Sequence, residues 1–566
     1  MNFFSGRVTI LILLVLLAAV ILSICLLAAV PPVSRDALIH HLAVPKLYLA
    51  HGGIYEIPHL DFSYYTMNLD LMYLIPLYFN NDILPKYIHF AFALITAVMI
   101  YRYLSRRLGV QYALLGSLFF LTIPVIVRLS TTVYIDLGVV CFLLAAMIYH
   151  FHWIESGFRC KYLFFSALFC GLALGTKYNG LLGLFLLGLL GAFAYARYHT
   201  GQKHLTVRTV GWSTGFVLVA LIVFSPWMIR NYIWTGNPVY PFYKHVFNAQ
   251  PPLELENDGG ESPSERSGRF THIQVRRLIY GESWLEIALI PLRVFFEGKD
   301  DLPQHFDGRT NPFLLLLPLF AFWGIRSNSR QVKTEKWIML FFSLFFLLYA
   351  CVQTAVRIRY FSPIIPPLVI LAIFGLHNLQ LVFKDVSRRL CGRFPGLTGK
   401  IALGAILLIM FGWNGVYLAE RFQKDDPLSY ITGNVSRDEY IQARRPEYAV
   451  MQYANEHLGK NAKILGVFVG KRGYYADIDI EFSTRLLPRL AAESASAREM
   501  AEKLINRGFT HLLINIPYMN YWGQEYALQE KKRLQDFFSK HTKALFSRDG
   551  HSLLRITGAP EPAMSP

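Results

Sequence analysis

Two aspartates of this sequence stand at the edges of long apolar runs, where a charged side chain is costly and is retained mainly for function. Asp36 follows the apolar run 8–30 and the proline pair that ends it, and Asp136 stands near the beginning of the run 133–153. A carboxylate in such a position can accept a proton from a nucleophile or hold a cation. The structural alternative is equally simple, because aspartate is a good helix N-cap and an acid is favourable in the first turn of a helix.

Three cations depart from the general distribution of charge in the chain. Lys177 lies in a very short turn between two apolar runs, and Arg357 and Arg359 lie in another. Arginine holds phosphate through bidentate hydrogen bonds, so these residues are candidates for binding a phosphate group at the membrane surface. In the alternative, the two arginines extend to lipid headgroups. Arg230, beside Asn231, is a further phosphate-binding candidate or simply part of a loop scaffold.

The segment after the first apolar run offers candidates for a substrate pocket, namely His40, His41, Tyr64 and Tyr65. Its acids and histidines also raise the alternative of a divalent metal site. None of them has the spacing of a metal-ligand motif. We therefore assign no metal ligand and no cofactor, and keep a divalent metal as the open alternative. The residues that could share such a metal are Asp36, His40, His41, Asp61 and Asp136.

The composition places these residues in an integral membrane protein. Of the 566 residues, 54% are hydrophobic and only 16% are charged, whereas about a quarter of a soluble domain is charged. The mean hydropathy is +0.35. The formal net charge of +17 would suit a nucleic-acid partner, but the cations collect in short loops between apolar runs. Because that distribution is an orientation signal, we expect membrane lipids and no nucleic acid as partners.

The apolar runs predict a polytopic α-helical membrane protein with about eleven transmembrane helices. Several runs fall short of the roughly 20 residues that span a bilayer, so their boundaries are soft. The first run lacks a clear cleavage site and is interpreted as a retained anchor. The expected spans are 8–30, 87–103, 112–127, 133–153, 162–176, 180–198, 210–229, 311–325, 337–354, 361–383 and 401–418.

Alternate loops between these runs carry the cations, which predicts a cytoplasmic N-terminus and an extracytoplasmic C-terminus. The opposite loops are poorer in cations, and the candidate site residues fall on that external side. The cations that set the orientation are Arg106 and Arg107; Arg159 and Lys161; Arg197, Lys203 and Arg208; Arg326, Arg330, Lys333 and Lys336; and Lys384, Arg388, Arg389, Arg393 and Lys400.

Two domains follow from this organisation, a transmembrane domain at 1–420 and an extracytoplasmic α/β domain at 421–566. The transmembrane domain has two long external loops, 31–86 and 230–309. The first is rich in Tyr, His and Asn and is expected to form short helices along the interface. The second is expected to contain a mobile loop at 257–268, followed by an amphipathic helical region that breaks near Gly281.

The tail alternates between helical periodicity and short apolar runs, which is typical of a small α/β domain. Its segment 469–473 lacks the spacing of a phosphate-binding P-loop, so a structural or acceptor-recognising role is favoured. Helices are expected at 447–458 and 495–507 and strands at 463–469 and 511–516, with a last helix–strand pair in 529–556.

A set of motifs in the spanning region resembles the membrane glycosyltransferases of the GT-C fold, in particular bacterial relatives of the protein mannosyltransferases and of the lipid A aminoarabinose transferase. No single motif is specific to this family, but the order of the motifs and their positions in the predicted topology together indicate it. The motifs are Arg35-Asp36-Ala37-Leu38-x-x-His41-Leu42, Tyr134-Ile135-Asp136-Leu137, Thr176-Lys177-Tyr178, Trp227-Met228-Ile229-Arg230-Asn231, Gly236-Asn237-Pro238 and Arg359-Tyr360-x-x-Pro363.

The resemblance implies transfer of a hexose or pentose from a polyprenyl-phosphate carrier to an acceptor glycan, lipid or protein at the external face of a bacterial inner membrane. Asp36 matches the position of the family's catalytic first-loop acid, and Asp136 that of its second acid. One departure is that many relatives carry a Lys-Pro-Pro run later in the first loop, where this chain has 64–67, Tyr-Tyr-Thr-Met. A lysine or metal ligand of that region therefore cannot be carried over.

The residues themselves suit the same chemistry, because displacement of a phosphate leaving group needs a base for the acceptor and cations for the departing charge. We expect Asp36 to be the general base and Asp136 to orient the acceptor or a cation. The phosphate is assigned to Arg357, Arg359 and Lys177. In-line attack would invert the anomeric centre.

Two other classes remain as alternatives, a transporter or flippase for a lipid-linked sugar and a non-catalytic scaffold whose external domain recruits an enzyme. Transporters tend to have repeated halves and ionisable groups near the middle of the membrane. The chain has no evident repeat, and its candidate ionisable residues lie at the ends of apolar runs. These features favour the glycosyltransferase.

Overall fold

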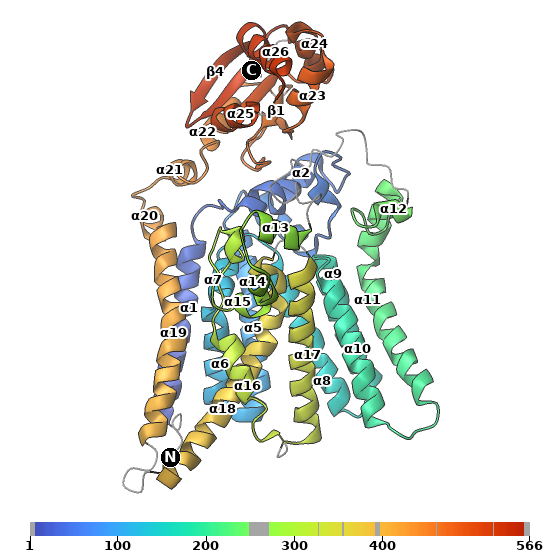
Figure 1. The fold of residues 1–566 in the computed structure, drawn as a ribbon, viewed down its shortest axis with the longest axis vertical. Coiled ribbons are helices and arrows are strands. Elements are labelled where there is room, and N and C mark those ends of the chain that lie inside the picture. Colours follow the sequence, from blue (N-terminus) through green and yellow to red (C-terminus); the bar gives the residue numbers. More distant parts are fainter. Residues whose placement is uncertain are drawn as a thin grey trace.

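The computed structural model describes residues 6–247, 271–325, 328–353, 356–390, 397–459, 461–524 and 526–559. These residues form a bundle of long helices with a small domain above one end of it (Figure 1). The N-terminal end of the chain lies at the opposite end of the bundle from that domain. The expected mobile loop 257–268, Arg326, Arg393 and the last residue of the span 337–354 lie outside the described residues.

Eight described helices are long and apolar enough to cross a membrane, and a pair bent by 67° makes a ninth if it is counted as one span. The bent pair is α6 (Val110–Thr122) with α7 (Pro124–Ser130). The eight are α1 (Arg7–Ala28), α5 (Leu84–Leu108), α8 (Asp136–Glu155), α10 (Gly180–Tyr198), α11 (Leu205–Thr235), α17 (Arg330–Gln353), α18 (Ile365–Leu390, with the turn Ile358–Ile364 before it) and α19 (Leu397–Asp425).

The expected count of eleven spans therefore exceeds the count that helix length supports among the described residues. The run at 162–176 forms α9 (Cys160–Thr176), an apolar helix of 17 residues that packs against α8. The run at 311–325 forms only α16 (Phe313–Phe320), whose eight residues are about 12 Å long. An apolar run in a sequence does not say where its helix stops, and here turns replace the helix after residue 320.

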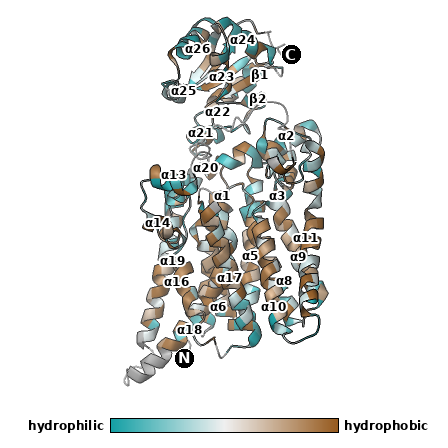
Figure 2. Ribbon diagram, turned by 45° about the vertical axis from the view of Figure 1, so that its right-hand side comes forward, coloured by the Kyte–Doolittle hydropathy of each residue, from teal (hydrophilic) through white to brown (hydrophobic). Residues whose placement is uncertain are grey.

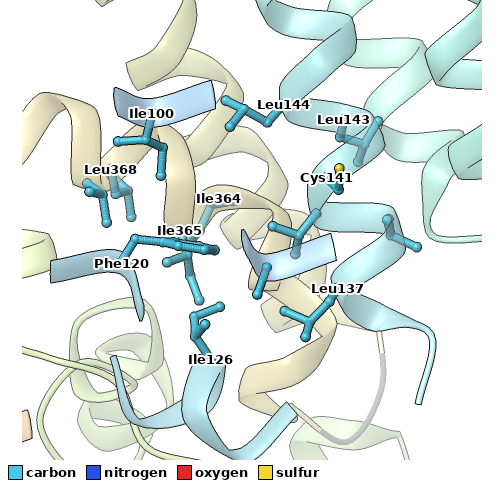
Figure 3. Close-up of a cluster of buried hydrophobic side chains, with 14 of the residues drawn as sticks. Ile100, Phe120, Ile126, Leu137, Cys141, Leu143, Leu144, Ile364, Ile365 and Leu368 are labelled. Atoms are coloured by element: carbon cyan, nitrogen blue, oxygen red, sulfur yellow. The ribbon is translucent and has the colours of Figure 1, made fainter. Parts of the chain in front are cut away.

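The core of the bundle lies around α8 and α18. In each of these two helices 78% of the most apolar window is buried, against 17% in α1 and 22% in α11 and α19. Figure 3 shows the side chains that α5, α6, α7, α8 and α18 contribute to this core, including Ile100 and Phe120. The outer helices keep hydrophobic surfaces exposed, as expected where lipid surrounds them (Figure 2).

Short helices occupy the segment between α1 and α5, which we call the first loop (29–83), as the sequence predicts. They are a π-helical turn at Ala37–His41, α2 (Ala43–His51), a 3-10 turn at Asp61–Tyr64, α3 (Asn68–Met72) and α4 (Leu74–Tyr78). The segment between α11 and α16 contains α12 (Lys244–Phe247), α13 (His272–Leu278), α14 (Trp284–Ala288), α15 (Ile290–Arg293) and a 3-10 turn at Pro303–His305. The expected break at Gly281 is present, with φ of 70° between α13 and α14.

The tail forms a five-stranded sheet covered by helices, which confirms the predicted α/β domain. The strand order is β2-β1-β3-β5-β4, with β1 parallel to β2 and β3 and with β5 antiparallel to β3 and β4. One apolar cluster joins α23 (Leu486–Glu493), α24 (Ala497–Asn506) and α26 (Leu528–Lys540) to the sheet, and a second joins α22 (Tyr448–His457) to it. The strands are β1 (Lys463–Val467), β2 (Asp479–Phe482), β3 (His511–Asn515), β4 (Thr542–Arg548) and β5 (His551–Ile556).

The helices of the tail begin with α20, which follows α19 directly and leads from the bundle into the domain (Figure 1). They are α20 (Pro427–Ile431), α21 (Arg437–Gln442), α22 (Tyr448–His457), α23 (Leu486–Glu493), α24 (Ala497–Asn506), α25 (Ile516–Gly523) and α26 (Leu528–Lys540).

Candidate active site

The candidate site lies at the end of the bundle that faces the C-terminal domain, where four distant segments meet. Asp36 directly precedes the π-helical turn of the first loop, and Asp136 is the first residue of α8. Lys177 directly follows α9, and Arg359 lies in the 3-10 turn before α18. The end of a helix is rigid but lies near the membrane surface. Each charged side chain is therefore fixed in position outside the hydrocarbon core of the bilayer.

Asp36 forms an ion pair with Arg359, whose guanidinium lies 2.6 Å from the carboxylate oxygen Oδ2. The helical turn begins at Ala37 as a capping aspartate would predict, but the Asp36 side chain makes no cap hydrogen bond. Burial alone would raise the pKa of Asp36, but the charge and hydrogen bond of Arg359, together with the neighbouring histidines, hold this pKa well below its usual range. The carboxylate is therefore ionised and directed to the site.

Asp136 forms a second ion pair, with 2.7 Å between its Oδ1 atom and Nζ of Lys177. The Asp136 side chain is only 4% exposed, whereas that of Asp36 is 20% exposed. Its other oxygen, Oδ2, is buried and has no hydrogen-bond partner. A buried carboxylate oxygen without a partner is costly, so this atom can accept a hydrogen bond from a bound molecule.

Aromatic rings connect the two ion pairs. The Arg359 guanidinium lies over the rings of Tyr134 and Tyr360, at 4.8 and 5.3 Å from their centroids. Lys177 Nζ lies 5.1 Å from the centroid of the same Tyr360 ring. The Nε atom of Arg359 is buried without a hydrogen-bond partner. Both cations thus converge on one ring and retain capacity for an anion.

The histidine pair lies beside these groups as two neutral rings. His41 Nδ1 is 2.7 Å from Oδ1 of Asp70, and the His40 ring is stacked on Phe62 with 4.4 Å between centroids. Burial lowers the pKa of each histidine to about 3. Burial also raises the pKa of Asp70 to about 7, so below that pH both members of the His41–Asp70 pair are mainly neutral. His40 Nδ1 is buried and has no partner, which leaves it available to a ligand.

Two of the predicted cations lie farther from the ion pairs. Arg357 is 3.6 Å from Asp307, at the edge of the site. Arg230 donates hydrogen bonds to the carbonyls of Tyr64 and Tyr65, at 2.8 and 2.9 Å, and so anchors the first loop to α11. Its Nη1 atom is buried without a partner.

The two predicted pocket tyrosines differ in position. Tyr64 is 1% exposed, and its hydroxyl donates to Glu56, so its side chain is packed away from any open pocket. Tyr65 lies within the aromatic group around the site, 5.7 Å from Phe62 and 5.9 Å from Tyr178 between ring centroids.

Several residues of the site are missing from the sequence prediction. His89 of α5 accepts a hydrogen bond from the Leu137 backbone at 2.9 Å and so fixes the helix end that carries Asp136. A histidine inside an apolar run is a signal that could have identified it. Asp70 gave no such signal, because only the packing of the first loop brings it to the site. Tyr134 and Tyr360 stand in two of the motifs quoted above, but the sequence assigned them no role.

Among the described residues, no group of three or more His, Cys, Asp and Glu side chains is arranged to hold a metal ion. Each of the two site aspartates is instead paired with a cation of the protein, Arg359 or Lys177.

The helical bundle, the helical first loop that carries Asp36 and the mixed-sheet domain after the last span together form a fold that is also found among solved membrane proteins. Residues 79–229 match the family model "Dolichyl-phosphate-mannose-protein mannosyltransferase". The match includes Asp136 and Lys177 but neither Asp36 nor Arg359. A comparison with curated proteins finds no match.

The solved proteins that are similar over nearly the whole chain include the following two. ArnT from Cupriavidus metallidurans bound to undecaprenyl phosphate is 12% identical with a TM-score of 0.53, covering 97% of this chain and 98% of its own. Its apo form gives a TM-score of 0.52. The oligosaccharyltransferase of Archaeoglobus fulgidus in the apo form is 11% identical with a TM-score of 0.53, covering 95% of this chain and 74% of its own. At these identities the likeness establishes the fold, and it confirms the predicted GT-C resemblance at that level.

Proposed function

We propose that the protein is an inverting glycosyltransferase that moves a sugar from a polyprenyl-phosphate carrier to an acceptor at the external face of the membrane. The observation that carries this proposal is the pair of carboxylate–cation contacts, Asp36–Arg359 and Asp136–Lys177, at one end of a GT-C bundle. The similar protein ArnT is described as bound to undecaprenyl phosphate, which supports a lipid-linked donor.

The reaction joins the acceptor oxygen to C1 of the sugar while the bond from C1 to the phosphate oxygen breaks. The bonding electrons leave with the phosphate, whose charge is held by Arg359 and Lys177. The acceptor proton passes to Asp36, the more exposed of the two acids. Attack from the face opposite the phosphate inverts the anomeric centre.

The ion pair of the free site explains how Asp36 can be both strongly acidic and a base. While Arg359 binds it, the carboxylate has a low pKa and little affinity for a proton. A donor phosphate competes for the same guanidinium, because arginine prefers a bidentate phosphate contact. Once Arg359 has changed partner, Asp36 loses its counterion and its proton affinity rises. Donor binding thereby activates the base.

The remaining groups hold the reactants. Asp136 accepts a hydrogen bond from the acceptor through its unpartnered Oδ2, while His40 offers Nδ1 to the sugar or the acceptor. Arg357 extends the cationic surface toward the phosphate, and Arg230 holds the first loop through the Tyr64 and Tyr65 carbonyls. The proposal assigns no metal, and activity after treatment with a chelator tests the divalent-metal alternative.

The setting proposed for this reaction is a bacterial inner membrane, with the N-terminus cytoplasmic and the C-terminal domain extracytoplasmic. The candidate site and the C-terminal domain share one end of the bundle, and the N-terminus lies at the other (Figure 1). This arrangement supports a single external face that holds both the site and the domain. Labelling of single introduced cysteines in intact cells tests the orientation.

The experiment that tests the function uses the purified protein in liposomes with a panel of radiolabelled polyprenyl-phosphate sugars. Release of free polyprenyl phosphate or of sugar is measured for the wild type, Asp36→Asn and the control Asp536→Asn, which changes an exposed acid of α26. Turnover of one donor by the wild type and the control, with loss in Asp36→Asn, supports the proposal and identifies the sugar. Donor movement across sealed vesicles without turnover would support a flippase instead, and donor binding alone would support a scaffold.

A further inference from the structure

One loop of the C-terminal domain contacts the segment that carries Asp36. This β1–β2 loop (468–478) descends from the sheet toward the first loop (Figure 1). The Tyr474 backbone N–H donates to the Leu38 carbonyl at 3.1 Å, and the Tyr475 hydroxyl donates to the Pro32 carbonyl at 2.8 Å. These two contacts lie on either side of Asp36 in the sequence, two residues after it and four residues before it.

Lys46 provides the strongest part of this contact. Its Nζ atom donates to the carbonyls of Tyr474 and Ala476 at 2.8 and 2.9 Å and to Oδ1 of Asp477 at 2.6 Å. An ammonium group has three N–H donors, so all of them are used by the β1–β2 loop. Asp477 is 69% exposed, and an exposed ion pair contributes little. The two carbonyl contacts therefore give the interaction its geometry.

The β1–β2 loop is itself fixed to the body of its domain. Asn455 of α22 donates to the Tyr475 carbonyl at 2.9 Å and accepts from the Asp477 backbone at 2.8 Å. Arg472 of the loop forms an ion pair with the buried Glu447, just before α22. A loop held at both of these points transmits the position of the domain to the residues that it contacts.

The segment around Asp36 contains little regular structure, although Ala37 and Leu38 directly after it are buried in the bundle. It consists of an irregular stretch after α1 and a single π-helical turn, and α2 with Lys46 follows at once. The ion pair to Arg359 is the contact that the donor phosphate must break in the proposed mechanism. At that moment the Asp36 carboxylate loses its main restraint on the bundle side, and the contacts of the β1–β2 loop remain.

We propose that the β1–β2 loop is a positioning element of the active site and that Lys46 is a positioning residue for Asp36. The C-terminal domain then has a part in the chemical step, which goes beyond recognition of an acceptor. This inference rests on the proposed glycosyltransferase function, because it assigns the geometry of the base in that reaction. A misplacement of about 1 Å at a reacting group costs about 100-fold in rate, so the effect of losing this contact on the rate is large enough to measure.

The test compares Lys46→Met with Lys46→Arg and with the control Lys540→Met, which breaks an exposed lysine–aspartate pair on α26. Transfer to an acceptor and hydrolysis of the donor by water are both measured in liposomes. We expect Lys46→Met to lower kcat about 10- to 100-fold in both reactions, with the donor KM within about twofold of the wild type. Lys46→Arg should recover most of the rate, because a guanidinium can still donate to the two carbonyls. Lys540→Met should behave as the wild type.

Two results would overturn the inference. One is an unchanged kcat in Lys46→Met, and the other is a rise in the acceptor KM with donor hydrolysis unaffected, which would mean that the loop acts only in acceptor recognition. Hydrogen exchange supplies a readout that does not need turnover. Amides in 32–42 should exchange faster in Lys46→Met than in Lys540→Met, and equal exchange would exclude the positioning role.

The same data separate this inference from the proposed function. A wild type that turns over no donor contradicts the function, whatever Lys46 does. A wild type with turnover that Lys46→Met retains in full contradicts only the positioning role. Thermal unfolding of each variant in detergent shows whether a loss of rate comes from loss of the fold. In that case, the comparison of hydrogen exchange in residues 32–42 decides whether Lys46 has the positioning role.

Discussion

Two carboxylate–arginine pairs, each at least partly buried, lie at opposite ends of the bundle, and they differ in how completely their atoms are hydrogen-bonded. Glu335, at the end near the N-terminus, is 0% exposed and accepts hydrogen bonds from Arg107, Tyr103 and Gln331. At the domain-facing end, the Asp36–Arg359 pair lies among polar atoms without partners: His40 Nδ1, Asp136 Oδ2 and Arg359 Nε. The hydrogen bonds of Glu335 are satisfied within the protein, whereas the unpartnered atoms around the Asp36–Arg359 pair can still bind a ligand.

The comparison teaches that burial of charge does not by itself indicate a functional site. Both pairs are costly to bury, and a bundle can retain one simply because its hydrogen bonds are satisfied. Unpartnered donors and acceptors that converge on one place are the better indicator, because a protein has no structural reason to leave them open. Mutations in the two pairs should therefore affect different properties.

The largest effect is expected from Asp36→Asn, because an amide cannot take the acceptor proton. General-base catalysis contributes about 10² to 10⁴-fold, so we expect a loss of about 10³-fold in kcat per folded molecule. The change also leaves Arg359 without its counterion, so a loss of thermal stability should accompany the loss of turnover. The measurement is turnover of the active donor in liposomes. Wild-type turnover in a folded Asp36→Asn protein would remove this residue from the mechanism.

Arg359→Gln should reduce kcat/KM for the donor by about 100-fold, since it removes one charged donor to the leaving phosphate. The same change also releases Asp36 from its counterion, so the pKa of this acid should rise toward its ordinary value. The acid limb of kcat/KM against pH should accordingly move to higher pH. A profile that keeps its wild-type acid limb would show that Arg359 does not control the ionisation of Asp36.

Glu335→Gln tests the other end of the bundle and should affect stability alone. It leaves Arg107 partly buried without its counterion, at a cost of about 3 kcal/mol in the free energy of unfolding. Turnover per folded molecule should equal that of the wild type. A loss of turnover at unchanged stability would mean that the pair near the N-terminus is also part of the site, and the comparison above would fail.

The smallest effect concerns Asp70 and the pH dependence of stability. Its pKa in the folded protein is raised from 3.8 to about 7 by burial, so its contribution to stability is fully present below 3.8 and is lost as the pH rises through about 7. Between pH 5 and pH 8 the wild type should therefore lose stability relative to Asp70→Asn, which keeps a hydrogen bond to neutral His41. The buried histidines His40 and His41 act in the opposite direction in both proteins, so the difference between the two unfolding temperatures reports on Asp70. An identical dependence in both proteins would contradict this assignment.

The sequence by itself predicted the features that depend on neighbouring residues in the chain and on their hydrophobicity. The apolar runs predicted the long helices, because 20 apolar residues have few alternatives to a membrane helix. The alternation in the tail predicted the α/β domain. However, β2 (Asp479–Phe482) was missed because four residues with two acids do not look like a strand, and the single strand expected in 529–556 is the antiparallel pair β4 and β5. The positions of Asp36 and Asp136 beside apolar runs marked them as candidates before any contact was known.

Only the tertiary structure decided which cation each acid meets, that Tyr64 is packed against its surroundings while Tyr65 joins the site, and that α16 is too short to span. It also decided the contact of Lys46 with the β1–β2 loop, whose partners are separated by more than 400 residues. The physical reason is the same in each case. A helix or a strand is determined by neighbours within a few residues, whereas an ion pair across a bundle depends on how whole elements pack, and a sequence position carries no record of that packing.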